Sequence, residues 1–334
     1  MKRLVALILL IAFSLVLCVG CNKDDELPEK TVAHKDDELS EKTVARIAGM
    51  KGPTSIGLTK VMEDNDGSYE FTVEGTADAI VPKLVKGELD MAAVPANLAS
   101  TLYNNTEGEI QILAVNTLGV LYIVSKGVEI NSIEDLKGKT VLATGKGTTP
   151  EYALRYILKE NEIDPEADLT LVFKSEATEV VAALKNSESG VAMLPQPYVT
   201  VAMSNVSGLE VALDLNAEWK KVGPESAIVT GVLVVRKSFA EENKELVKGF
   251  LSQYRSSVEY VNSEVAAAAE LVAKHGIFDN AKVIEKAIPK CNITFISGED
   301  MISPVNKYLG VLYEQNPKSV GGKLPSEDFF CILD

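Results

Sequence analysis

Gly119-Val-Leu-Tyr-Ile-Val-Ser-Lys126 and Gly231-Val-Leu-Val-Val-Arg-Lys237 are two segments with nearly the same pattern, far apart in the chain. Each is an apolar, largely β-branched run that ends in a basic residue, which favours a buried strand. We interpret them as two strands that cross between two lobes, although two ordinary buried strands would show the same pattern. The crossing interpretation predicts a discontinuous lobe one, residues 44–124 plus 232–334, and a lobe two of residues 125–231.

Outward from these segments, short apolar runs alternate with helical patterns, which is typical of an α/β domain with largely parallel sheets. The expected strands are 44–48, 69–74, 91–94, 110–115, 140–143, 170–173, 191–194 and 210–213. The expected helices include 54–64, 77–86, 150–161, 177–187 and a long helical end from Asn243 onward. A body of about 290 residues is large for one core and suits two α/β lobes.

The N-terminus has the pattern of an export signal. Lys2 and Arg3 precede an uncharged run that reaches Val19, too short as a helix to cross a hydrocarbon core of ~30 Å. The run ends in Leu17-Cys-Val-Gly-Cys21, which resembles the lipobox where a bacterial signal peptidase leaves a diacylated cysteine. Cys18 stands where the usual pattern has leucine. The resemblance implies a signal peptide, 1–20, and a lipid anchor at Cys21.

Residues 21–43 are expected to form a disordered tether. Residues 23–34 and 35–46 are a tandem duplication with ten of twelve positions identical. The copies are too charged, and too poor in large apolar groups, to bury a core. The duplication either extends the reach from the membrane or is neutral.

The net charge of −15 becomes about −17 without Lys2 and Arg3. A protein so negative is a poor partner for nucleic acid and anionic lipid, so the lipid anchor is the expected membrane contact.

Cysteine and histidine usage restricts the possible chemistry. Cys291 and Cys331 remain after the anchor is assigned, and they form either a disulfide, which export permits, or two buried free thiols. The two histidines, His34 and His275, are too few for a histidine triad or a metal cluster. The sequence also lacks a nucleophile elbow, a P-loop and a dinucleotide fingerprint. We expect no catalytic residue, metal or cofactor.

Four motifs resemble those of a known family. They are Ile133-Glu-Asp-Leu-Lys-Gly-Lys-Thr-Val141, Met50-Lys-Gly-Pro-Thr-Ser-Ile-Gly57, Gly87-Glu-Leu-Asp-Met-Ala-Ala-Val-Pro95 and Leu194-Pro-Gln-Pro197. Together they resemble bacterial ABC-transporter solute-binding proteins of the sulfonate, nitrate, taurine and thiamine-precursor type, over about residues 45–330. The resemblance implies a type II periplasmic-binding-protein fold, with a small-molecule cleft between two lobes joined by two crossing strands. It also implies an ABC permease with its ATPase as partner, and a monomer anchored on the extracytoplasmic face of the membrane.

Ligands of parallel α/β sheets bind at the carboxyl ends of the strands, so the loops there are the candidate site. These loops are 50–55, 94–97, 145–149 and 195–198. In Gly145-Lys-Gly-Thr-Thr-Pro150 we expect a helix N-terminus with Thr149 as its cap, in a position either to bind a ligand's oxygens or simply to cap the helix. The candidate ligand-binding residues are Lys51, Thr54, Ser55, Pro95, Asn97, Thr117, Thr148, Thr149, Gln196, Tyr198 and Thr230.

The residue types in these loops restrict the ligand. The mature chain has four arginines, Arg46, Arg155, Arg236 and Arg255, and none falls in a cleft loop, which argues against bidentate carboxylate recognition. Gln196 lies between two prolines, and its amide can donate and accept, which suits a neutral or zwitterionic ligand. Tyr103, Tyr152, Tyr198 and Trp219 could stack on a planar ligand or pack in the core. Sulfonates, thiamine-precursor pyrimidines and other heteroaromatics all remain open.

Two alternative functions have different sequence requirements. The resemblance extends to fungal pyrimidine synthases, which are enzymes, but their cysteine-rich motif is absent from this sequence. A ligand-sensing module of a receptor is the second alternative, and it would require a signalling domain.

Overall fold

The computed structural model describes residues 43–223 and 226–333. The expected signal peptide, the anchor Cys21 and the tether up to residue 42 lie outside these described residues. Within the described part, no helix has both the length and the apolar character that crossing a membrane requires.

The first sheet has six strands in the order β11-β4-β10-β3-β1-β2. Its strands are β1 (Ala45–Met50), β2 (Tyr69–Glu74), β3 (Met91–Pro95), β4 (Ile110–Thr117), β10 (Gly231–Arg236) and β11 (Ile293–Ser297). Strand β1 pairs in parallel with β2 and β3, whereas β10 is antiparallel to β3 and β4.

The second sheet has five strands in the order β7-β6-β8-β5-β9. They are β5 (Leu121–Lys126), β6 (Thr140–Ala143), β7 (Thr170–Phe173), β8 (Gly190–Pro195) and β9 (Leu209–Asp214). Strand β6 is parallel to β7 and β8, and β5 is antiparallel to β8 and β9. Both sheets are therefore mixed, and the prediction of largely parallel sheets is wrong. The reason is the crossing of the chain between the sheets. It enters the second sheet at β5 and returns to the first sheet at β10, and each of these strands lies antiparallel to both of its neighbours.

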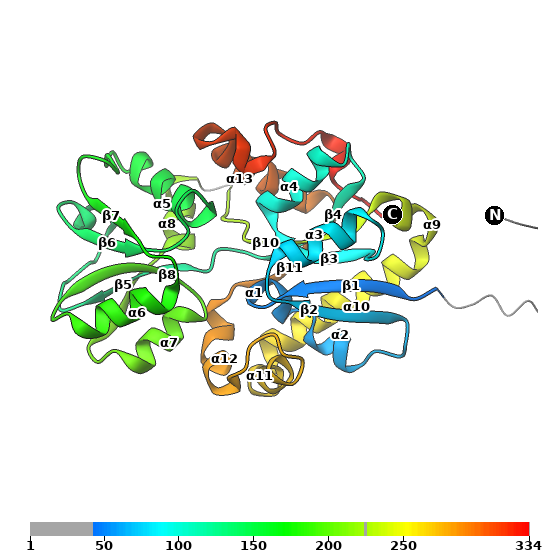
Figure 1. Ribbon diagram of the computed structural model, residues 1–334, viewed down its shortest axis with the longest axis horizontal. Helices are drawn as coiled ribbons and strands as arrows, with labels where there is room; N and C mark the ends of the chain where they lie inside the picture. Colours follow the sequence, from blue (N-terminus) through cyan, green and yellow to red (C-terminus); the bar gives the residue numbers. More distant parts are fainter. Residues whose placement is uncertain (1–42, 224–225, 334) are drawn as a thin grey trace, which may run out of the picture. The chain divides into compact units, whose positions relative to one another are not determined.

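Each sheet carries helices of its own (Figure 1). Those that follow strands of the first sheet are α1 (Pro53–Ile56), α2 (Thr59–Glu63), α3 (Ala77–Val85), α4 (Ala96–Asn105), α9 (Lys237–Glu242), α10 (Lys244–Ser263), α11 (Val265–Lys274), α12 (Ala281–Ala287) and α13 (Ile302–Gln315). Those that follow strands of the second sheet are α5 (Thr149–Glu160), α6 (Ala177–Asn186), α7 (Tyr198–Asn205) and α8 (Leu215–Val222). Short 3-10 helices are η1 (Ile133–Leu136), η2 (Ile288–Lys290), η3 (Gly298–Met301), η4 (Pro317–Val320) and η5 (Glu327–Phe329).

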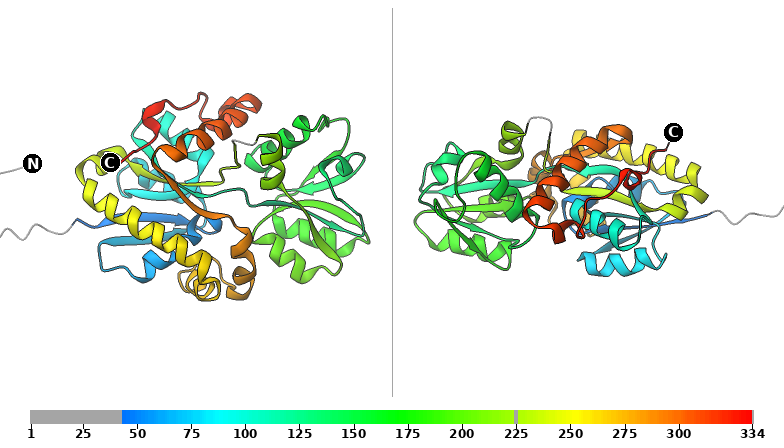
Figure 2. Two further views of the ribbon diagram at one scale, coloured as in Figure 1. Left: turned by 180° about the vertical axis from the view of Figure 1, so that it is seen from behind. Right: turned by 90° about the horizontal axis from the view of Figure 1, so that it is seen from above.

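The two look-alike segments are strands buried on both faces. In β10, Val232 and Val234 pack in the cluster under α3, α4 and α13, whereas Leu233 packs in the cluster under α2, α10 and α11. Successive side chains of a strand point to opposite faces, so a strand covered on both faces has an uninterrupted apolar pattern. Strand β5 is arranged in the same way, with Ile123 on one face of its sheet and Val124 on the other. Figure 2 shows the long helix α10, in yellow, running along the first sheet.

The chain passes from the first sheet to the second between Thr117 and Leu121, and it returns before Gly231. The expected lobe boundaries, 124/125 and 231/232, lie within a few residues of these two crossings and stay a prediction.

All eight expected strands are present, within a few residues at their ends. Two helix predictions need correction. The expected helix 54–64 is two short helices, α1 and α2, and the helical end from Asn243 is interrupted by β11, whose β-branched and aromatic run pairs with β4. Cys291 and Cys331 are free thiols, so the disulfide alternative is wrong. Burial raises the pKa of the Cys291 thiol to about 12.

Candidate functional site

A cavity of about 960 Å³ lies where loops from both sheets meet. Its wall includes residues that follow the carboxyl ends of β1 and β3 in the first sheet and of β6 and β8 in the second. This is the position at which α/β sheets bind ligands. The size suits a small organic molecule.

Eight of the eleven predicted site residues line this cavity. They are Lys51, Pro95, Asn97, Thr148, Thr149, Gln196, Tyr198 and Thr230. They come from five separate segments of the chain, and the fold brings these segments together at one place.

The other three predicted residues, Thr54, Ser55 and Thr117, lie behind the wall. The Thr54 carbonyl accepts a hydrogen bond from Asn116 Nδ2 at 3.1 Å, and Thr117 Oγ1 donates to Asn116 Oδ1 at 3.0 Å. Helix α1 is a single turn that directs Thr54 and Ser55 into the first lobe, so residues 51–53 form this part of the wall. The geometry gives no support to ligand contacts from these three side chains.

The N-terminus of α5 faces the cavity, but its cap differs from the expected one. Thr148, not Thr149, is the N-cap, and Thr148 Oγ1 donates to the Gly145 carbonyl at 2.6 Å instead of accepting from the first turn. Glu151 fixes the loop because its Oε2 accepts from the Gly147 N–H at 2.5 Å. The cap side chain therefore accepts no hydrogen bond from the first turn, but the buried carboxylate of Glu151 lies in that turn and offsets part of its positive charge.

Gln196 is 2% exposed and lies in the wall contributed by the second sheet. Its Oε1 accepts from Thr200 Oγ1 at 2.9 Å and from the Thr200 N–H at 3.4 Å. The sequence predicts an amide that both donates to and accepts from a ligand, but in the structure the amide oxygen already accepts from Thr200.

Few charges line the cavity. Among the described lining residues, the ionisable side chains apart from the Tyr198 phenol are Lys51 and Asp279, both exposed. The arginines lie elsewhere: Arg46 and Arg236 pair with Asp90, Arg155 pairs with Glu151 and Glu166, and Arg255 covers the Phe295 ring. Among the described residues, no group of three or more His, Cys, Asp or Glu side chains is placed to hold a metal ion.

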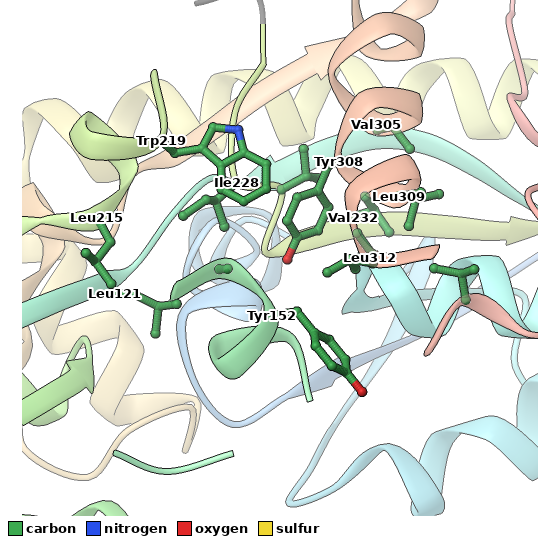
Figure 3. Close-up of a cluster of buried hydrophobic side chains, with 14 of the residues drawn as sticks. Leu121, Tyr152, Leu215, Trp219, Ile228, Val232, Val305, Tyr308, Leu309 and Leu312 are labelled. Atoms are coloured by element: carbon green, nitrogen blue, oxygen red, sulfur yellow. The ribbon is translucent and has the colours of Figure 1, made fainter. Parts of the chain in front are cut away.

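Of the four aromatic residues considered for stacking, Tyr198 lines the cavity. Tyr103 packs edge-on against Phe329, with ring centroids 5.0 Å apart. Tyr152 and Trp219 belong to an apolar cluster of the second lobe's helices with α13, shown in Figure 3.

Much of the wall was not predicted from the sequence. Gly52, Pro53, Pro195 and Pro197 lie in the predicted loops but are not among the candidate residues. The lining residues outside both the predicted loops and the candidate set are Val120, Leu121, Pro150, Val201, Ser204, Asn205, Ile228, Ile277, Phe278, Asp279, Asn280 and Val283. The segment 277–283 connects α11 to α12, so reasoning from strand ends does not reach it. One signal was present: Gly276 (φ +69°) ends a helix, and Asn280, whose side chain accepts from the Val283 N–H, begins the next.

A family model described as NMT1-like family matches residues 59–275. The chain belongs to the NMT1-like family. The matched region runs from α2 to the end of α11 and includes the crossing strands and much of the cavity wall, whereas the lining residues 51–53 and 277–283 lie outside it.

Named relatives of this NMT1-like chain are binding proteins. One from Brucella abortus (strain 2308) is 23% identical over 207 residues, which are 62% of this chain and 61% of that protein. YtlA of Bacillus subtilis (strain 168) is 23% identical over 151 residues, 45% of this chain and 43% of that protein. The match therefore spans less than two thirds of either relative.

Solved structures confirm the type II periplasmic-binding-protein fold that the resemblance implied. An ABC transporter protein from Parabacteroides distasonis has a TM-score of 0.74 at 24% identity, covering 86% of this NMT1-like chain and 99% of that chain. The periplasmic aliphatic sulphonate binding protein SsuA from Escherichia coli has a TM-score of 0.68 at 16% identity, covering 87% and 94%.

Proposed function

We propose that this chain is the substrate-binding protein of an ABC importer, and that it binds a small organic solute in the cavity between its lobes. The observation that carries the proposal is the cavity itself, which is built from the strand ends of both sheets. A ligand held from both sides favours the closed arrangement of the lobes, and closure is a signal that a permease can recognise.

The chemistry of the wall supports a sulfonate-like or heteroaromatic solute. Apolar side chains such as Val120, Ile228 and Phe278 surround an organic body, and amides and hydroxyls such as Asn97 and Thr149 offer hydrogen bonds. The fold shared with SsuA, an aliphatic sulphonate binding protein, supports the sulfonate-like member of this class. We propose binding and release without a chemical step, in agreement with a described wall made mostly of apolar side chains, amides and hydroxyls.

The decisive experiment is mass spectrometry of small molecules released from the full chain after purification without dialysis. We expect one organic solute near one equivalent. Added back to stripped protein at a hundredfold over its Kd, it should contribute ~2.7 kcal/mol to the free energy of unfolding. If nothing is released and no sulfonate or heteroaromatic compound stabilises the protein, the proposal fails.

We further propose that the mature protein is a monomeric lipoprotein held by diacylated Cys21 on the extracytoplasmic face, with the permease and its ATPase as partners. The support is the sequence around the cleavage site, Val19-Gly20-Cys21. Cys21→Ser should move the protein from the membrane fraction to the soluble fraction. A variant that still sediments with membranes would disprove the anchor.

A further inference from the structure

The orientation of the Gln196 amide is fixed by Thr200. A backbone N–H can only donate, so the Gln196 atom that faces the Thr200 N–H must be the oxygen, Oε1. The Thr200 hydroxyl donates to the same oxygen at 2.9 Å and thereby reinforces this orientation. The two N–H groups of Nε2 are directed away from Thr200.

Nε2 has no hydrogen-bond partner among the described residues, although the Gln196 side chain is almost completely buried in the cavity wall. A buried donor without a partner is costly, so such a donor in a native wall calls for an explanation. A ligand in the cavity can supply the missing acceptor.

Capping of α7 does not explain the amide. The Thr200 N–H belongs to the first turn of α7, so the Gln196 oxygen satisfies one of that helix's free donors. A glutamate would cap this turn at least as well, because its negative charge also interacts favourably with the helix dipole. What glutamine adds is the NH2 group, which the cap does not use.

We propose that Gln196 is a donor-only contact for the ligand, that Thr200 is the residue that positions it, and that the ligand is a small organic molecule presenting a hydrogen-bond acceptor toward the second lobe. This inference rests on the proposed function of the cavity. Such acceptors are carbonyl, carboxylate and sulfonyl oxygens and ring nitrogens. Among the described lining residues the one carboxylate, Asp279, is exposed, so no buried negative charge of the described wall opposes such an acceptor.

The test uses three probes of one shape: benzoate (acceptors only), benzamide (acceptor and donor) and benzamidinium (donors only). Each is titrated at pH 8 into the stripped full chain, with the melting temperature as readout. We expect wild type to bind benzamide and benzoate roughly tenfold more tightly than benzamidinium, the worth of about one well-placed hydrogen bond. Gln196→Glu keeps the shape and the cap but presents a carboxylate oxygen, so it should reverse the order.

Two variants of the neighbour separate positioning from structure. Thr200→Val removes the shorter of the two hydrogen bonds to Gln196 Oε1 and leaves the 3.4 Å bond from the backbone N–H, so the amide is held less firmly and the preference for acceptor probes should shrink severalfold. Thr200→Ser retains the hydroxyl and should retain the preference, even if its unliganded melting temperature falls by a similar amount. A preference that is unchanged in Thr200→Val would remove the Thr200 hydroxyl from the proposal and leave the backbone N–H as the group that orients the amide.

Several results would overturn the donor assignment. They are equal stabilisation of wild type by all three probes, tighter binding of benzamidinium, an unchanged order in Gln196→Glu, and no stabilisation by any probe. The importer function would survive each of them if a solute is released from the undialysed protein, because that measurement does not depend on the polarity of Gln196.

Discussion

Asp90 shows how one buried side chain joins three neighbouring strands. Its carboxylate is 1% exposed and accepts from the Arg46 N–H and Nε, both at 2.9 Å, and from Arg46 Nη2 at 2.7 Å. Arg236, at the end of β10, donates to the same carboxylate at 3.2 Å. Burial alone would raise the pKa of Asp90, but the hydrogen bonds and charge of Arg46 outweigh it, helped by Arg236, and the pKa lies below its usual value.

Asp90→Asn should therefore lower the free energy of unfolding by roughly 2 kcal/mol at pH 7, the worth of hydrogen bonds to charged groups, moderated because both arginines are partly exposed. A carboxyl whose folded pKa is depressed stabilises the protein above its unfolded pKa of about 3.9, and the stabilisation is lost as the pH falls through the folded pKa. Urea unfolding at pH 7 and near pH 3 should show that the difference in free energy of unfolding between wild type and variant is smaller at the lower pH.

The control is Asp64→Asn, which breaks an exposed ion pair with Lys60 and should cost under about 1 kcal/mol. A difference independent of pH would contradict this account.

For single residues, the sequence predicted the positions of side chains better than their hydrogen-bonding roles. The position of Gln196 followed from its place after a buried strand, but its polarity depends on Thr200, four residues on and one helical turn away. Thr54 and Ser55 were expected in the cleft wall, but they lie buried in α1, a single turn whose Ile56 packs beneath the first sheet, and the local sequence pattern does not show which way so short a turn directs its side chains.

At the scale of elements, the strands were predictable because burial on two faces leaves an uninterrupted apolar run. The directions of the strands were not predictable. Strands β5 and β10 follow crossings from one sheet to the other, and the pattern of apolar residues in a strand is the same for parallel and antiparallel pairing. The glycines that open the look-alike segments do have a structural reason. A Cβ on Gly119 would lie 2.6 Å from Asn216 Cβ, and one on Gly231 would lie 2.5 Å from Thr54 Cγ2 and from Asn116 Oδ1.

We expect Gly231→Ala to destabilise the protein by about 1–3 kcal/mol, the usual cost of overpacking, because the new methyl group meets side chains on two sides. The matched control is Gly249→Ala in α10, where a Cβ meets nothing within 4 Å and the lost chain freedom of glycine should add ~0.5–1 kcal/mol of stability. Urea unfolding of both variants measures the contrast. Similar effects of the two substitutions would show that the crossing before β10 is not tightly packed.

At the scale of the whole body, residues 43–223 and 226–333, the lobes touch differently on the two sides of the cavity. On one side α13 packs against α5 and α8, where the rings of Trp219 and Tyr308 have centroids 5.7 Å apart (Figure 3). Gln315 Nε2 and Asn316 Nδ2 donate to the Tyr152 carbonyl and hydroxyl at 2.9 and 2.8 Å. On the other side α12 meets α7, and the cavity residues there include exposed Ser204, Asn205, Asp279 and Asn280. An apolar, hydrogen-bonded contact is harder to separate than an exposed polar one. We therefore expect the lobes to open on the α7 and α12 side, with the α13 side remaining closed.

Trp219 provides a direct test, because it is the one tryptophan of the sequence and is fully buried in this contact. When the released solute is added back to stripped protein, small-angle scattering should report a smaller radius of gyration, since the lobes close over the cavity. The emission maximum of Trp219 should stay at the blue, buried position in both states, with urea-unfolded protein as the reference for full exposure. A red-shifted emission in the stripped protein that reverses with solute would mean that the α13 contact itself separates and that the hinge lies elsewhere. An unchanged radius of gyration at saturation would instead exclude closure.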